Sequence, residues 1–337
     1  MSHSKTFAAV LVLATIVACA VAGGASVPAA AKATAFDRTC GPARAKERTV
    51  NGTLGSITVR GTPKRIVALE FSFVDDLAAI GLKPVGIADD NDPVRIIPPV
   101  RPKVAGYTSV GLRQTPNLET IASLHPDLII ADSDRHAKIY NQLKNIAPTI
   151  ALDNLNQAYL PNLHSAIVIG QLVNRCGAMR VRVAQDKAIM RRIRSKLPKR
   201  ETRKALFAVT TNKVFNMHTG LAYTPSLLAA IGIPAAVTPK AGSTPTQELT
   251  LESLITINPD ILFISQNPPT PTTDQNFSKS PLWSQLNAVK NRKVYFVNTN
   301  LWSKARGLLA GELIAQQAAH LLYNKYVSIK LPKVTVK

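Results

Sequence analysis

Arginines and other polar residues recur in segments that come after predicted strands in both halves of the chain. These segments lie at 89–95, 110–113, 132–136, 216–219 and 300–307. Arginine keeps its charge at physiological pH and binds carboxylates through two parallel hydrogen bonds. Open α/β sheets bind ligands at the carboxyl ends of their strands. We therefore expect Arg113, Arg135 and Arg306 to face one cleft and to hold a polyanionic ligand.

The sequence lacks the motifs of common enzyme and nucleotide-binding classes. It contains no glycine-rich dinucleotide or phosphate loop, no Gly-x-Ser-x-Gly elbow and no His-Glu-x-x-His motif. The six histidines are scattered, and no pair has a spacing typical of a metal site. Residues 132–136 are rich in ionisable groups, but a catalytic site also needs a nucleophile, a base and an orienting group. We expect a protein that is not an enzyme and has no cofactor.

Short apolar strands alternate with helices around these loops. Strands are predicted at 65–69, 84–88, 127–131, 205–209, 261–265 and 294–297. Helices are predicted at 73–80, from 119, and at 226–231, 251–257 and 308–323. Such alternation indicates parallel sheets covered on both faces. The alternating residues 49–59 around Asn51-Gly52 predict a β-hairpin.

The two halves of the chain also resemble each other. Asn117-Leu118-Glu119 is matched by Thr250-Leu251-Glu252, and His125-Pro126-Asp127 by Asn258-Pro259-Asp260. Between them, the apolar spacing of residues 161–198 predicts one long helix, or two abutting helices, that ends before Pro198. At 1.5 Å per residue, a single helix would run roughly 50 Å. The sequence therefore predicts an α/β protein with two similar lobes around a helical strut.

The first residues are typical of an export signal. Lys5 precedes an apolar run at 7–18 that is too short to cross a bilayer. The run ends in a segment that resembles a bacterial lipobox, in which Cys19 would carry the lipid; ordinary cleavage near Ala22 is the alternative. After this signal peptide at 1–22, we expect a flexible tether at 23–48, an N-terminal lobe at 49–160, the interlobe helix at 161–198 and a C-terminal lobe at 199–337.

Cys40 and Cys176 remain once Cys19 is assigned to processing. An exported chain can join them in a disulfide. Cys176 fits equally well as a small buried side chain. The spacing does not decide between these two interpretations.

The 337-residue chain carries a formal net charge of +21, which favours anionic partners. Much of the excess lies between Arg180 and Lys204. This run has no interleaved aromatic residues that could stack on bases, and the export signal argues against access to nucleic acid. We expect no nucleic-acid partner. The run is typical of a solvated helix face, and contact with a membrane surface or cell wall is the alternative.

Several segments resemble the iron(III)-siderophore substrate-binding proteins, and within them the iron(III) dicitrate binders. The clearest are 65–72, 86–92 and 117–121, and the resemblance continues through 130–136, 216–219 and 302–306. It extends from residue 60 to residue 325. It implies two Rossmann-like lobes with central sheets, joined by one long interlobe helix in a class III periplasmic-binding-protein fold. It also implies a ligand between the lobes and delivery to the permease dimer of an ABC importer.

The resemblance further implies one acidic permease-docking residue on each lobe. Glu119 and Glu252 occupy equivalent positions in the two repeats. Both also suit a helix start, where the macrodipole favours a carboxylate, and the two roles are compatible. The expected ligand-binding residues are Arg113, Arg135 and Arg306 with Trp302 as a cleft wall, followed by Arg95, Tyr107, His136 and His218. The two histidines are equally well explained as structural groups. Iron would be held by its chelator, so no protein metal ligands are expected.

This sequence departs from the dicitrate binders in its lipobox, its Cys40 segment, its basic surface and residues 266–280. Another carboxylate or hydroxamate siderophore therefore stays open as the ligand. Haem or cobalamin capture is a related alternative, and a basic cell-surface protein that binds a polyanion is an unrelated one. We expect an exported monomer, held as a lipoprotein at the outer face of the cytoplasmic membrane or free in the periplasm.

Overall fold

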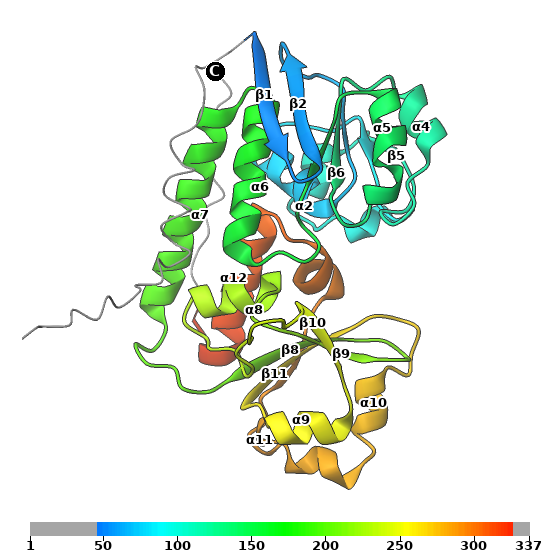
Figure 1. Cartoon of the computed structure of the whole chain (residues 1–337). Helices are drawn as coiled ribbons and strands as arrows, with labels where there is room; N and C mark the ends of the chain where they lie inside the picture. Colours follow the sequence, from blue (N-terminus) through cyan, green and yellow to red (C-terminus); the bar gives the residue numbers. More distant parts are fainter. Residues whose placement is uncertain (1–45, 326–337) are drawn as a thin grey trace, which may run out of the picture.

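The computed structural model describes residues 46–325 as two lobes beside a pair of long helices (Figure 1). The N-terminal lobe is built on a sheet with strand order β5-β4-β3-β6-β7, in which every neighbouring pair is parallel. Its strands are β3 (Ile66–Ala68), β4 (Gly86–Ile87), β5 (Thr108–Ser109), β6 (Leu128–Asp132) and β7 (Thr149–Leu152). All residues of β3, β4, β6 and β7 are buried. The parallel sheet predicted from continuous apolar strands is confirmed for this lobe.

Two helices of the N-terminal lobe begin close to their predicted positions. The predicted helices are α2 (Phe71–Ala79) and α4 (Leu118–Ser123). The lobe also contains α3 (Arg101–Val104), α5 (Tyr140–Ile146) and the 3₁₀ turns η1 (Pro93–Arg95) and η2 (Ala137–Ile139), which were not predicted. The side chain of Asn117 accepts a hydrogen bond from the backbone N–H of Thr120 at 2.8 Å. This N-cap explains why α4 begins at Leu118.

The hairpin predicted at 49–59 is present as β1 (Glu47–Gly52) and β2 (Gly55–Arg60), but its turn lies two residues later than the Asn-Gly pair. Gly52 is paired with Gly55, so Thr53 and Leu54 form the turn. A Cβ on Gly52 would lie 2.6 Å from the carbonyl oxygen of Ala151. The glycine is therefore needed for close approach to β7 rather than for the turn.

The C-terminal lobe has a mixed sheet, which corrects the expectation of a second parallel sheet. Its order is β10-β9-β8-β11-β12, and β9 runs antiparallel to both of its neighbours. The strands are β8 (Ala205–Thr210), β9 (Phe215–His218), β10 (Thr246–Leu249), β11 (Ile261–Gln266) and β12 (Val294–Phe296). Only four residues separate β8 from β9, which is too short for a parallel crossover and sufficient for a hairpin.

The helices predicted in the C-terminal lobe are confirmed. They are α8 (Tyr223–Ala230), α9 (Leu251–Ile257) and α12 (Leu308–Tyr323). The lobe also contains α10 (Thr273–Phe277), α11 (Asn287–Lys290), a 3₁₀ turn η3 (Pro281–Gln285) and a short π-helical turn η4 (Asn300–Lys304), which were not predicted. No helix among residues 46–325 has both the length and the apolar character that a membrane crossing requires.

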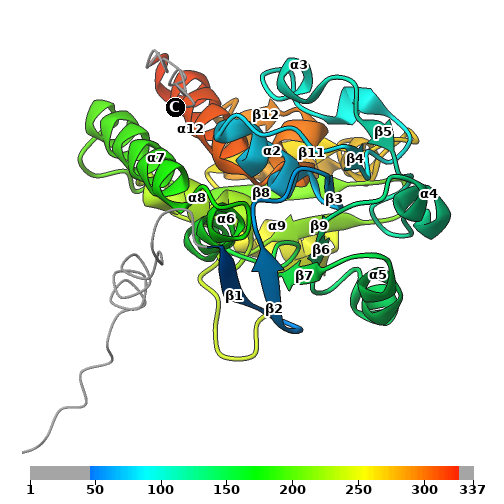
Figure 2. The same ribbon diagram turned by 90° about the horizontal axis from the view of Figure 1, so that it is seen from above.

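Of the two alternatives predicted for 161–198, the structure has two helices rather than one continuous helix. The segment forms α6 (Tyr159–Leu172) and α7 (Cys176–Lys196), which turn back on each other and lie side by side (Figure 1, Figure 2). Asn174 adopts a left-handed conformation with φ of 57° at the turn. A Cβ on Gly170 would lie 2.5 Å from Cβ of Met179, so glycine lets the two helices meet there. The interlobe helix is therefore α7 alone, which spans about 31 Å.

A second connection between the lobes joins α2 to the first turn of α12. Asp75 accepts hydrogen bonds from the backbone N–H groups of Leu309 and Ala310 at 2.9 and 2.8 Å. Asp76 accepts one from the backbone N–H of Leu308 at 3.2 Å. Two carboxylates of the N-terminal lobe thus satisfy free N–H groups of a helix that follows the C-terminal sheet. We call Asp75, Asp76 and the first turn of α12 the interlobe clamp.

Candidate functional site

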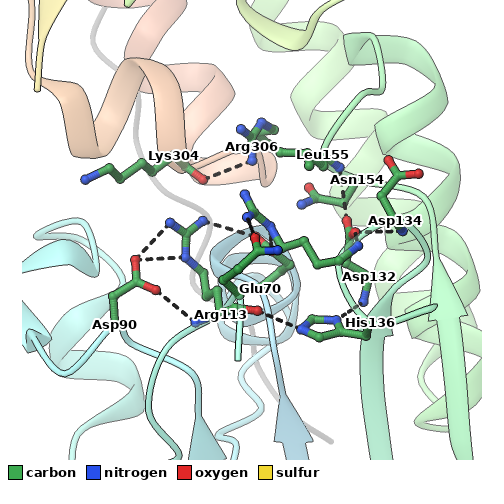
Figure 3. A network of polar contacts seen from close by, with 12 residues as sticks. Glu70, Asp90, Arg113, Asp132, Asp134, His136, Asn154, Leu155, Lys304 and Arg306 are labelled. Atoms are coloured by element: carbon green, nitrogen blue, oxygen red, sulfur yellow. Dashed lines mark hydrogen bonds and ion pairs between the residues drawn. The ribbon is translucent and has the colours of Figure 1, made fainter. Parts of the chain in front are cut away.

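The carboxyl ends of β3, β4 and β6 face the segment that contains η4 and the start of α12. A cavity of about 300 Å³ opens between the lobes here. Its lining includes Leu155 and Asn156 before α6, Asn216 and His218 on β9, and Trp302 and Arg306. Charged residues of the N-terminal lobe gather opposite Arg306 (Figure 3). Of the predicted ligand-binding residues, Arg306, Trp302 and His218 line this cavity, whereas Arg113 and Arg135 lie beside it around Glu70.

Arg113 lies in the loop after β5 and is bracketed by two carboxylates. Its Nε and Nη2 donate to Oδ2 of Asp90 at 3.1 and 2.9 Å, and its Nη1 lies 3.2 Å from Oε2 of Glu70. Its guanidinium also lies 4.3 Å from the centre of the Phe71 ring. Burial opposes the charge of Arg113, but the two carboxylates outweigh this effect and raise its pKa. Most of its donors are already used within the N-terminal lobe.

Arg135 follows β6 and shares the same internal carboxylate. Its Nε lies 2.5 Å from Oε1 of Glu70, and its Nη1 donates to Gln114 at 2.8 Å. The loop that carries it is shaped by Asp132, whose Oδ1 accepts the backbone N–H groups of Asp134 and Arg135 at 2.9 and 2.7 Å. Nη2 of Arg135 has no hydrogen bond within the described part of the chain, so this donor stays available.

Arg306 differs from the other arginines because it has no acidic partner among residues 46–325. It is 9% exposed, and its only hydrogen bond to a described residue is a long one of 3.5 Å to the carbonyl oxygen of Lys304. Burial lowers the pKa of Arg306 to about 10; the charge of Glu70 opposes this, and Arg113 and Arg135 add to it. Lys304 is likewise without a carboxylate partner in that range, and burial with repulsion from Arg95 and Arg113 lowers its pKa to about 8. Two cations of the C-terminal lobe therefore face the cleft without an ion pair to any described carboxylate.

Arg95 and Tyr107 lie toward the rim and are held by neighbouring carboxylates. Arg95 pairs with Asp90 at 2.9 Å and with Asp92 at 3.5 Å, and its side chain is 34% exposed. The hydroxyl of Tyr107 donates to Asp89 at 2.7 Å. Tyr107 therefore supports the loop after β4, and its hydroxyl is already used.

His136 supports Arg113 from below. Its Nδ1 accepts the backbone N–H of Asp132 at 2.8 Å, so the ring must be neutral, and Nε2 donates to the carbonyl oxygen of Arg113 at 2.8 Å. Burial lowers the pKa of His136, which favours this neutral form. Because the ring is 0% exposed, its place in the predicted binding set is that of a structural group.

His218 and Trp302 line the cavity from the C-terminal lobe. Burial, aided by the nearby charge of Arg306, lowers the pKa of His218 to about 3, so its imidazole is neutral. Trp302 donates from its indole N–H to Gln317 at 2.8 Å and packs against Phe207 and Phe263. It is only 1% exposed, so the predicted cleft wall is largely a core residue.

Sequence reasoning missed three charged residues of this site. Glu70 and Asp90 provide the internal carboxylates, and Lys304 adds a cation opposite them. Each stands directly beside a predicted strand end or a predicted ligand-binding segment. An acidic residue immediately after a buried strand was the available signal for Glu70.

The predicted docking residues occupy equivalent exposed positions on the two lobes. Glu119 lies in the first turn of α4 and Glu252 in the first turn of α9, and each helix is capped by the residue two positions before its glutamate. Figure 1 places α4 and α9 on different lobes, far from each other. No group of three or more His, Cys, Asp or Glu side chains within 46–325 could hold a metal ion. Cys176 is disulfide-bonded, and its partner lies outside the described residues, as do Cys19, Cys40 and the predicted signal and most of the tether.

Comparison with known proteins agrees with this architecture. The periplasmic binding protein family model matches residues 66–301. The chain is 40% identical to the Fe(3+) dicitrate-binding periplasmic protein FecB of Escherichia coli (strain K12) over 281 residues, which cover 83% of this chain and 92% of that protein. It is also 40% identical to the Fe(3+)-citrate-binding protein YfmC of Bacillus subtilis (strain 168), with 82% of this chain and 87% of that protein covered.

Among solved structures, Staphylococcus aureus SirA complexed with staphyloferrin B superposes with a TM-score of 0.72 at 22% identity, covering 82% of this chain and 98% of that one. This likeness supports the two-lobed fold, and the resemblance read from the sequence is confirmed by the relatives. Their printed names describe binding proteins, which agrees with the expectation that the protein is not an enzyme. The chain belongs to the periplasmic binding protein family.

Proposed function

We propose that the protein is the substrate-binding component of an ABC importer and captures an anionic iron(III) chelate between its lobes. The observation that carries this proposal is the buried guanidinium of Arg306, which no carboxylate of the described residues neutralises. A buried charge without a counter-ion costs several kcal/mol. A ligand carboxylate in the cleft would supply the missing counter-ion. The printed names of two relatives that are 40% identical, which bind Fe(3+) dicitrate and Fe(3+)-citrate, favour a carboxylate chelate.

The residues of the site differ in what they can offer such a ligand. Arg306 and Lys304 present unpaired charges, and Arg135 keeps a free Nη2. We assign these three the direct contacts. Arg113, whose donors are largely used by Glu70 and Asp90, supplies positive potential and a supporting contact. Arg95 lies at the rim, and Trp302 and His218 form an uncharged wall of the cavity. Tyr107 and His136 hold the loops that carry Asp89 and Arg113.

The cellular setting belongs to the same proposal. We propose an exported monomer that is anchored through Cys19. Its N-terminal lobe is 49–160, its interlobe segment is 161–198 with α7 as the interlobe helix, and its C-terminal lobe is 199–337. The cationic cleft favours a carboxylate chelate over haem or cobalamin, which would need a more aromatic lining. Iron is the cargo and is held by its chelator.

Intrinsic fluorescence tests the function directly. Titration with iron(III) dicitrate should quench tryptophan emission and saturate. The Trp302→Phe variant should lose most of this quenching, because Trp302 lines the interlobe cavity. The matched control is Trp283→Phe, since Trp283 lines a separate groove with Phe296 and Arg292. Unchanged emission at millimolar iron(III) dicitrate in the wild-type protein would contradict the proposal.

The docking role of Glu119 and Glu252 predicts a separation of binding from import. Replacing both with glutamine should leave the affinity for iron(III) dicitrate within about twofold, because both side chains are exposed and lie outside the cleft. Uptake of radioactive iron(III) citrate by cells with the cognate importer should fall at least tenfold, because charge-complementary contacts to the permease are lost. Glu248→Gln on β10 is the control for an exposed charge change. Normal uptake by the double variant would remove both residues from the docking surface.

A further inference from the structure

Glu70 pairs with two arginines of the N-terminal lobe, Arg113 and Arg135, and Figure 3 shows it beside Arg113 and facing Arg306. Its carboxylate is 0% exposed, with Oε1 2.5 Å from Nε of Arg135 and Oε2 3.2 Å from Nη1 of Arg113. Glu70 is the N-cap residue of α2, yet its side chain accepts no hydrogen bond from that helix. The carboxylate therefore serves the two guanidiniums rather than the helix.

The charges around Glu70 are paired unevenly. Glu70 and Asp90 form ion pairs with Arg113, Arg135 and Arg95, and Asp92 also pairs with Arg95. Asp132 adds a further negative charge that attracts Arg306 without an ion pair. The cations of the C-terminal lobe have no such partner within the described residues. Glu70 also attracts the charge of Arg306 across the cleft. One internal negative charge thus acts on guanidiniums from both lobes.

We propose that Glu70 is a charge-selectivity residue: it acts as an internal counter-anion that fixes the geometry of Arg113 and Arg135 and limits how much negative charge the bound chelate can carry. This inference rests on the proposed function and extends it to ligand choice. Two effects follow from the same carboxylate. It orients the guanidiniums, which helps every anionic chelate equally, and it repels each additional ligand carboxylate, which disfavours the more highly charged chelates.

A ratio of two affinities separates these effects. We compare iron(III) complexes of citrate and of a citrate monoamide, which are similar in size but differ in negative charge. The ratio is the affinity for the citrate complex divided by the affinity for the monoamide complex. Loss of orientation in Glu70→Gln should change both affinities alike and cancel in their ratio. Loss of repulsion should favour the citrate complex, so the ratio should rise about tenfold, as expected for unit charges several ångströms apart at low effective dielectric constant. The ratio should also become more dependent on salt.

Controls keep the inference testable if Glu70→Gln folds poorly. Adding Glu70→Gln to the Arg135→Gln variant removes the carboxylate in a background where one guanidinium is already gone. The ratio should again be higher in the double variant than in Arg135→Gln alone. Glu248→Gln, the same change on the exposed strand β10, should leave the ratio as in the wild-type protein. An unchanged ratio in both backgrounds would overturn the assignment of Glu70. Failure of the wild-type protein to bind either complex would instead overturn the proposed function.

Discussion

Replacing Arg306 with alanine should weaken the binding of iron(III) dicitrate about 100-fold or more while leaving the unliganded protein at least as stable. Arg306 is 9% exposed and makes no ion pair with residues 46–325. Each charge-assisted hydrogen bond contributes roughly 1.5–3 kcal/mol, so losing a bidentate contact gives a factor of this size. The side chain holds its charge against burial, which already lowers its pKa to about 10. Calorimetric titration measures the affinity, and thermal unfolding measures the stability.

Two other arginines provide the comparison. Arg95→Ala should cost less than tenfold in affinity, because this side chain is 34% exposed and pairs with Asp90 and Asp92 at the rim. Arg113→Ala should lower the melting temperature, since it leaves the buried Glu70 without one of its partners. An Arg306→Ala variant with wild-type affinity, or one that is clearly less stable, would contradict the role assigned to Arg306.

The sequence predicted the elements that position the site better than the contacts within it. Apolar strands next to capped helices are local patterns, and β3, β6, α4 and α12 follow them closely. The convergence of Arg113, Arg135 and Arg306 followed from their places after strands. Which arginine is neutralised depends on residues far away in the sequence, such as Glu70, which lies 43 positions before Arg113 and also pairs with Arg135. Such pairing is a tertiary property, and no spacing rule along the chain contains it.

For a related reason, the sequence did not decide between one long helix and two abutting helices. The apolar residues of 161–198 recur at helical spacing on both sides of Asn174, so the pattern does not reveal the turn there. The chain turns there because α6 and α7 both bury apolar faces, and Gly170 allows them to approach closely. A periodicity argument detects that a face is apolar but does not show whether the face packs against a neighbouring lobe or against the next helix.

Replacing Asp75 with alanine should destabilise the protein by about 2–4 kcal/mol. The variant leaves the backbone N–H groups of Leu309 and Ala310 buried without acceptors, and each such loss costs roughly 1–3 kcal/mol. Asp92→Ala is the matched control. Asp92 also accepts a backbone N–H, from Val94 at 3.0 Å, but it is 47% exposed at the start of η1 and should cost less than about 1 kcal/mol. Chemical denaturation of both variants measures the difference, and equal losses would exclude a special role for the interlobe clamp.

Two buried carboxyl groups, Asp75 of the interlobe clamp and Asp186 on α7, make the free energy of unfolding depend on pH. Burial raises the pKa of Asp75 to about 7, and burial likewise raises that of Asp186, which accepts the hydroxyl of Tyr159, to about 7. A carboxyl whose folded pKa is raised favours folding most at low pH, and this contribution is lost as pH rises through about 7. Between pH 6.5 and 8 the free energy of unfolding should fall by about 1–2 kcal/mol, and by less in Asp75→Ala. The lowered pKa values of His136, His164 and His218 act in the opposite direction near their unfolded value of 6.5, at the lower edge of this window, and therefore offset part of the fall. A free energy of unfolding that is constant or rises from pH 6.5 to 8 would contradict this account.

The clamp also connects stability to binding. Glu70 immediately precedes α2, which carries Asp75. Arg306 immediately precedes Gly307, the N-cap of α12, and Asp75 accepts hydrogen bonds from the first N–H groups of that helix. A Cβ on Gly307 would lie 2.4 Å from Cβ of Asp75, so the two helices meet as closely as glycine permits. Fixing α2 against α12 therefore fixes the internal carboxylate of one lobe against the unpaired guanidinium of the other. We expect Asp75→Ala to weaken binding several-fold beyond its effect on folding, measured by titration at a temperature where the variant is fully folded. Unchanged affinity in the folded variant would show that the clamp stabilises the protein without setting the geometry of the cleft.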